Sequence, residues 1–70
     1  MDSAEIIRKG IRVVIAKQGI SVARAAMKAQ MHPQQIGRFM TGKDIRISSL
    51  DRFCNDGLGV DLSVVMAEGL

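Results

Sequence analysis

The sequence predicts an all-α fold, a compact bundle of five short helices, and three observations support this. Apolar residues recur at helical spacing, no segment shows the period-two alternation of a strand, and seven glycines and one proline separate short segments. Because 70 residues have room for only one modest core, we expect a single domain over 1–70.

Residues 2–17 are expected to form the first helix, ending before Gly19. Its buried face follows the i, i+4, i+7 spacing of Ile7, Ile11 and Val14. Glu5 lies four residues before Lys9 and is expected to pair with it. Gly10 inside the helix is expected to cost about 1 kcal/mol relative to alanine.

A second helix is expected over 22–29, with Ser21 as its N-cap. Its buried face is nearly all alanine: Val22, Ala25, Ala26 and Ala29. Such small side chains indicate that another element packs close to the helix backbone. Pro33 suits the first position of a third helix over 33–41, which ends at Gly42.

Two further helices complete the expected bundle. Ser48 and Asp51 form a variant capping box for a helix over 49–56, whose inward residues are Leu50, Phe53 and Cys54. Asp61 then caps a last helix with an apolar face of Leu62, Val65 and Met66.

The composition argues against several classes of protein. One cysteine and one histidine allow neither an internal disulfide nor a structural zinc site, and we expect no metal or other cofactor. Two phenylalanines without tryptophan or tyrosine do not favour stacking on single-stranded nucleic acid. The sequence contains neither paired carboxylates nor a phosphate-binding loop, so we expect neither an enzyme nor a small-molecule substrate. The net charge of +3 is compatible with nucleic acid.

The expected location is the cytoplasm, at the nucleoid when DNA is bound. The longest apolar run, residues 13–16, is far too short to span a membrane. The beginning of the sequence is acidic before it is basic, unlike a signal peptide, and the free Cys54 suits a reducing compartment.

Residues 21–42 read SVARAAMKAQMHPQQIGRFMTG: a polar cap, an alanine pair, an apolar turn residue, a second cap, a central isoleucine and a closing glycine. This stretch resembles the helix-turn-helix of the phage repressor and Cro (Cro/C1-type) family, also called the xenobiotic-response-element family. The residues that carry the likeness are Ser21, Ala25, Ala26, Met31, His32, Ile36 and Gly42. The downstream SSLDRFCNDGLGVDLSVVM resembles the last two helices of that family.

The resemblance implies a lambda-repressor-like fold and a sequence-specific transcriptional regulator of phage or mobile-element type, acting as a repressor or autoregulator on double-stranded DNA. The helix over 33–41 would lie in the major groove. A homodimer on an inverted-repeat operator is expected, with the last helix as a candidate interface because Val64 and Leu70 exceed the needs of the core. The alternative is a protein-interaction module of the same fold, such as an antirepressor or antitoxin-like partner.

The base-reading candidates follow from the face of the third helix that is opposite Ile36 and Phe39. They are Gln34, Gln35 at the edge, Arg38, and Pro33 through van der Waals contact alone. Glutamine pairs bidentately with adenine and arginine with guanine, so Gln34 and Arg38 are the main candidates. Gly37, with no side chain, would let the helix approach the groove floor.

A second group of residues is expected to contact the DNA backbone. They are Ser21, Arg24, His32, Thr41, Lys43 and Arg46, with Lys43 and Arg46 in the loop that the family places near phosphates. Helix capping remains open for His32, and simple solvation remains open for Arg24. Three cations of the first helix, Arg8, Lys9 and Arg12, are expected to be solvated.

The sequence departs from the family pattern at three positions. Val22 cannot make the phosphate contact of the glutamine usual there, and Pro33 replaces a polar reader. Gln30 stands where a turn glycine is common, so it is expected to adopt a left-handed conformation.

Overall fold

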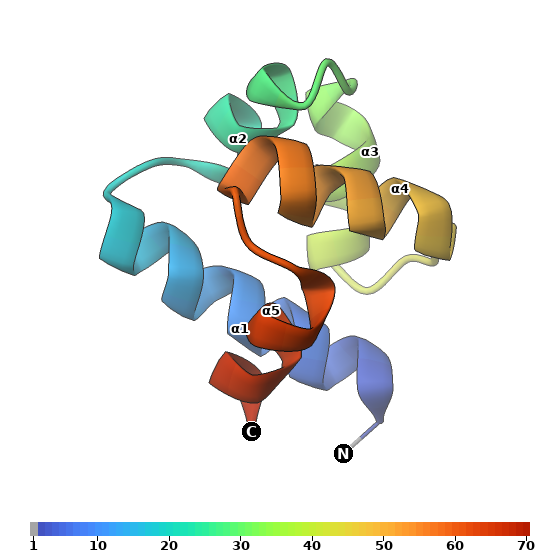
Figure 1. Cartoon of the computed structure of the whole chain (residues 1–70). Helices are drawn as coiled ribbons and strands as arrows, with labels where there is room; N and C mark the ends of the chain where they lie inside the picture. The colour runs from blue at the N-terminus through green and yellow to red at the C-terminus, as the bar shows by residue number, and fades with distance from the viewer. Residues whose placement is uncertain (1) are drawn as a thin grey trace.

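The structure, a computed structural model, describes residues 2–70, which form five α-helices. These are α1 (Ser3–Gln18), α2 (Val22–Lys28), α3 (Pro33–Met40), α4 (Ile47–Arg52) and α5 (Leu62–Gly69). A π-helical segment, Phe53–Leu58, continues α4 without a break (Figure 1). Residues 2–70 contain no strand, so the prediction of an all-helical protein with five helices is confirmed.

The first three helices begin and end within one residue of their predicted bounds. Ser21 caps α2 as predicted, because its Oγ accepts the N–H of Arg24 at 3.1 Å. Asp61 likewise caps α5 and accepts the N–H of Ser63 at 3.0 Å. The hydrogen bond from the Ser63 hydroxyl, followed by this backbone bond, lowers the pKa of the Asp61 carboxyl. Asp2, which the sequence analysis did not single out, caps α1 by accepting the N–H of Glu5 at 2.9 Å.

The predicted start of the fourth helix is wrong. The N-cap residue is Arg46, whose side chain makes no capping hydrogen bond, and Ser48 lies inside the first turn of α4. The helical path also runs two residues beyond the predicted end, because the π segment extends it to Leu58. At the end of this segment, Gln18 Nε2 donates to the Leu58 carbonyl at 2.6 Å and so supplies a donor to one of the last carbonyls of the segment.

The core gathers the apolar faces of all five helices and the π segment. Its buried side chains are Ile7, Ile11, Val14, Ala25, Ala26, Ala29, Met31, Ile36, Phe39, Leu50, Phe53, Cys54, Leu58 and Val65. Another element packs closely on the alanine face of α2 as expected. That element is the π segment, since a Cβ placed on Gly57 would lie 2.5 Å from the Ala25 carbonyl oxygen. The radius of gyration, 10.4 Å, is close to the value of about 11 Å expected for a compact chain of this length.

Left-handed residues end most of the helical segments. They are Gly19, Gln30, Gly42 and Gly59, and Gln30 has φ 57° as its place in the turn predicted. After α2, the N–H of Gln30 donates to the Met27 carbonyl at 3.0 Å and the N–H of Met31 to the Ala26 carbonyl at 2.9 Å. This pair of bonds is a Schellman motif, which satisfies the last carbonyls of α2 and turns the chain sharply toward α3.

The first helix differs from expectation at two positions. Glu5 pairs with Arg8 rather than with Lys9, and its Oε1 lies 2.6 Å from Arg8 Nη1. Gly10 is no simple weak point, because it lies where α1 meets α5, side by side in Figure 1.

None of the described helices combines the length and the apolarity needed to cross a membrane.

Candidate nucleic-acid interface

The third helix divides cleanly into a buried and an exposed face. Ile36 and Phe39 are in the core, where they are 0% and 3% exposed. Gln34 and Arg38 lie one turn apart on the outer face and are exposed, as predicted. Gly37 and Thr41 continue this face, and a shallow hollow runs between them and the two polar side chains. In the described part of the chain, neither Gln34 nor Arg38 has a side-chain hydrogen bond or ion pair.

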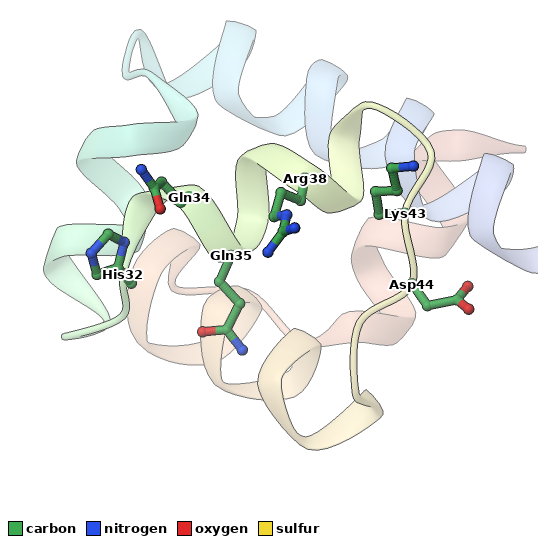
Figure 2. Close-up of a pocket in the computed structure, with 6 residues that line it drawn as sticks. All are labelled: His32, Gln34, Gln35, Arg38, Lys43 and Asp44. Carbon is green, nitrogen blue, oxygen red and sulfur yellow. The ribbon is translucent and has the colours of Figure 1, made fainter.

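Gln35 is arranged differently from Gln34. Its Nε2 donates to Ser49 Oγ of α4 at 3.0 Å, and Figure 2 shows the side chain extending over α4. The amide is therefore already oriented before any ligand arrives. The Gln35–Ser49 bond was not foreseen, because it joins residues 14 positions apart in the sequence.

The start of α3 holds two further predicted residues. Pro33 occupies the first turn and is half-buried, which leaves part of its ring available for van der Waals contact. His32 occupies the N-cap position but its side chain makes no capping bond. The imidazole is exposed at one edge of the same face (Figure 2).

The loop after α3 carries Lys43 and Arg46, both exposed. Lys43 joins His32, Gln34, Gln35, Arg38 and Asp44 around a hollow of about 390 Å³ (Figure 2). Thr41, by contrast, donates its hydroxyl proton to the Arg38 carbonyl at 2.8 Å. A phosphate contact through Thr41 would have to replace that bond.

On the other side of α3, the start of α2 presents Ser21 and Arg24. Both are exposed and line a third hollow with Ala23, Met27 and Lys28. The Ser21 oxygen accepts a bond from its own helix, but its hydroxyl proton remains available to a phosphate. The predicted backbone contacts thus flank the outer face of α3 on two sides.

Charge is distributed unevenly along the chain. Residues 21–46 contain one carboxylate, Asp44, against the cations Arg24, Lys28, Arg38, Lys43 and Arg46. Residues 47–70 reverse this, with one cation, Arg52, against Asp51, Asp56, Asp61 and Glu68. Within residues 2–70 the five cations of the first group form no ion pair. The candidate interface is therefore locally basic, although the whole chain is only mildly so.

Two arginines that hold these elements in place were missed. Arg52 Nε donates to the Ala29 carbonyl at 3.0 Å and so caps the end of α2. Arg8, predicted to be solvated, is 7% exposed and donates from Nε to the Phe39 carbonyl at 2.6 Å. Lys9 and Arg12 are exposed as predicted. The only sequence signal for Arg8 is its position beside Ile7, at the edge of the apolar stripe.

The remaining chemistry outside this face is limited. Cys54 is buried in the π segment, and burial, with the nearby Asp51 and Asp61 carboxylates, raises the pKa of its thiol to about 11. Within residues 2–70, histidine, cysteine and acidic side chains form no group of three that could hold a metal ion.

Comparisons with known proteins return nothing for this chain: no protein-family model, no curated protein and no solved structure matches it.

Proposed function

We propose that this protein is a sequence-specific double-stranded DNA-binding transcriptional regulator, a repressor or autoregulator of phage or mobile-element type. In this proposal α2, the turn at Gln30 and α3 form a helix-turn-helix of the phage repressor and Cro type, and α3 enters the major groove. The supporting observation is the outer face of α3. Gln34 and Arg38 are exposed there without side-chain partners in residues 2–70, and they can read adenine and guanine edges.

The backbone contacts of the proposed complex come from both sides of that face. Ser21 and Arg24 would contact one phosphate strand, and Lys43 and Arg46 the other. These contacts supply affinity and register, and each phosphate neutralised makes binding more sensitive to salt. Gln35, held by Ser49, would read the edge of the site, with His32 and Pro33 at its border.

We also propose that the protein binds as a homodimer through α5. Val64 and Leu70 are 45% and 83% exposed, and both belong to the end of the chain that lies on α1 (Figure 1). A single module of this size reads few base pairs, so two copies on half-sites about 34 Å apart gain specificity. An inverted-repeat operator is the expected consequence.

The first test is selection of bound duplexes from a randomised pool, followed by fluorescence anisotropy on the enriched site at two salt concentrations. Enrichment of an inverted repeat, with affinity falling steeply as salt rises, would support the proposal. Enrichment of a single half-site would support DNA reading but not the dimer. If no sequence is enriched, the protein-interaction module takes its place, and the exposed Met27 and Ile47 are its apolar contacts to examine.

Two substitutions distinguish a residue that reads DNA bases from a residue that contacts the DNA backbone. Arg38→Ala should relax base preference at one position and weaken the selected site by about 1–3 kcal/mol. Lys43→Ala should weaken all sequences about equally and reduce the salt dependence by about one phosphate. Lys9→Ala is the matched control, because Lys9 is exposed on α1, forms no ion pair within residues 2–70 and should not affect DNA binding. Equal effects of all three would place the interface elsewhere.

A further inference from the structure

Arg8 is the one buried charged residue in the described part of the chain. A buried guanidinium is tolerated only where its donors find acceptors, and all three nitrogens of the Arg8 guanidinium do so. Its Nη1 pairs with Glu5 Oε1 at 2.6 Å within α1, while its Nε and Nη2 reach carbonyls outside α1. The guanidinium also stacks on the Phe39 ring, with 4.6 Å between its central carbon and the ring centroid.

The carbonyls that Arg8 contacts belong to the end of α3 and to the loop beyond it. Nε donates to the Phe39 carbonyl at 2.6 Å, and Nη2 to the Lys43 carbonyl at 3.4 Å. The guanidinium thus lies at the negative end of the α3 dipole, where a cation is favoured. It joins α1 to the end of α3 and to the following loop, which lie 31 and 35 positions further along the chain.

Lys43 is otherwise weakly anchored. Its N–H donates to the Arg38 carbonyl at 3.0 Å, in the Schellman motif around Gly42, but its side chain is exposed and unpaired within residues 2–70. Arg8 is the group that ties the Lys43 carbonyl to α1 from the other side. Without Arg8, the backbone at Lys43 would be held by the Schellman bonds and by the packing of the partly buried Ile45 against the core.

We propose that Arg8 is a positioning residue that fixes the backbone of Lys43 so that its ammonium group meets a DNA phosphate. This inference rests on the proposed function. A contact whose geometry is set in advance needs no ordering on binding, so its loss weakens affinity even where the contacting residue is intact. Arg8 itself touches no DNA, and its effect acts through Lys43.

The test is a double-mutant cycle between Arg8→Met and Lys43→Ala, read as affinity for the selected duplex and as the dependence of affinity on salt. Methionine keeps the apolar stem without the donors. Each single variant should weaken binding about tenfold near 0.1 M salt and lower the salt slope by about 0.9, as for one phosphate. Lys43→Ala should add less than about twofold in the Arg8→Met background, because the contact is already lost.

Two controls separate positioning from simple loss of stability. Val14→Ala removes buried volume from the same helix, and it should leave the salt slope unchanged at a temperature where both variants are folded. Arg8→Lys keeps the charge but not the planar fork, so it should recover only part of the affinity. It also keeps the test available if Arg8→Met does not fold.

A readout without DNA distinguishes failure of this proposal from failure of the proposed function. Amide hydrogen exchange at Gly42 and Lys43 should accelerate at least tenfold in Arg8→Met, and more than elsewhere in α3. Faster exchange with no DNA binding in the wild type would overturn the function and, with it, the role of Arg8. Additive effects of the two substitutions, or an unchanged salt slope in Arg8→Met, would overturn the positioning role alone.

Discussion

Gly10 of α1 lies against the backbone of Val65 in α5, so closely that a Cβ added to Gly10 would overlap the Val65 carbonyl oxygen. Gly69 makes the reciprocal approach, since a Cβ there would overlap the Ile6 carbonyl oxygen and lie 3.0 Å from the Gly10 nitrogen. The two glycines allow the backbones of α1 and α5 to touch. The end of the chain is thereby fixed to its beginning.

Substitution of Gly10 by alanine should therefore destabilise the protein. Helix propensity alone predicts a gain of about 1 kcal/mol. The overlap with Val65 requires α5 to move, which costs about 1–3 kcal/mol or more. Urea unfolding followed by circular dichroism measures the difference, and we expect a lower midpoint with the overlap dominating. A higher midpoint than the wild type would mean that α5 can shift freely.

Gly37 provides the opposite case on α3. Nothing lies within 4 Å of a Cβ added there, so Gly37→Ala should stabilise the protein by up to about 1 kcal/mol. On the proposed interface, the added methyl would keep α3 from the groove floor. The same variant should then bind the selected duplex roughly tenfold more weakly, the effect of losing one base contact. A more stable protein with undiminished affinity would show that Gly37 does not face the DNA.

The sequence was sufficient to predict the features that depend on local pattern. The bounds of α1, α2 and α3 follow from the caps and the glycine and proline positions, and the exposed face of α3 follows from the period of 3.6 residues. The left-handed Gln30 was predictable from the resemblance of residues 21–42 to a helix-turn-helix, in which a glycine is common at this turn position. These local features are sufficient to locate most residues of the candidate interface on the fold.

Features that depend on distant partners could not be predicted in this way. Arg8 and Phe39 are 31 positions apart, and Arg52 and Ala29 are 23 apart, so no local pattern pairs them. The Ser48 prediction was wrong for a related reason. A serine followed by an acid resembles a cap, but the helix starts earlier, at Ile47, without a side-chain cap. The packing of the π segment on Ala25 is likewise a tertiary property.

Gln30 should be replaceable by glycine with a gain in stability. Its φ of 57° places the Cβ of an L-residue close to the following carbonyl, which costs about 1–2 kcal/mol that glycine avoids. Part of the gain is lost because glycine has more freedom in the unfolded chain, so we expect about 0.5–1 kcal/mol net. Arg52 Nη2 donates to the backbone carbonyl of residue 30, which glycine retains, so this bond should remain.

Thermal and urea unfolding of Gln30→Gly measure this gain. Gln30→Ala is the matched control, since it removes the same polar side chain but keeps the Cβ and should not be stabilised. Equal stability of the glycine and alanine variants would show that the side chain, and not the left-handed backbone, sets the energy of the turn.

Cys54 should make the stability of the protein fall at high pH. Burial, and then the Asp51 and Asp61 carboxylates, raise the pKa of its thiol from 9.0 to about 11 in the folded protein. Below pH 9 the thiol keeps its proton in both states, and the contribution to stability is fully present. Between pH 9 and 11 the unfolded chain releases the proton while the folded protein retains it. The free energy of unfolding then decreases, by at most about 1.4 kcal/mol per pH unit.

The measurement compares wild type and Cys54→Ala by urea unfolding from pH 8 to pH 11, because the difference between the two proteins isolates the contribution of the thiol. Cys54→Ala leaves a small cavity and should be less stable than the wild type at pH 8. The difference should shrink as the pH rises above 9, since only the wild type loses the contribution of the protonated thiol. A difference that stays constant up to pH 11 would contradict a raised pKa for Cys54 in the folded state.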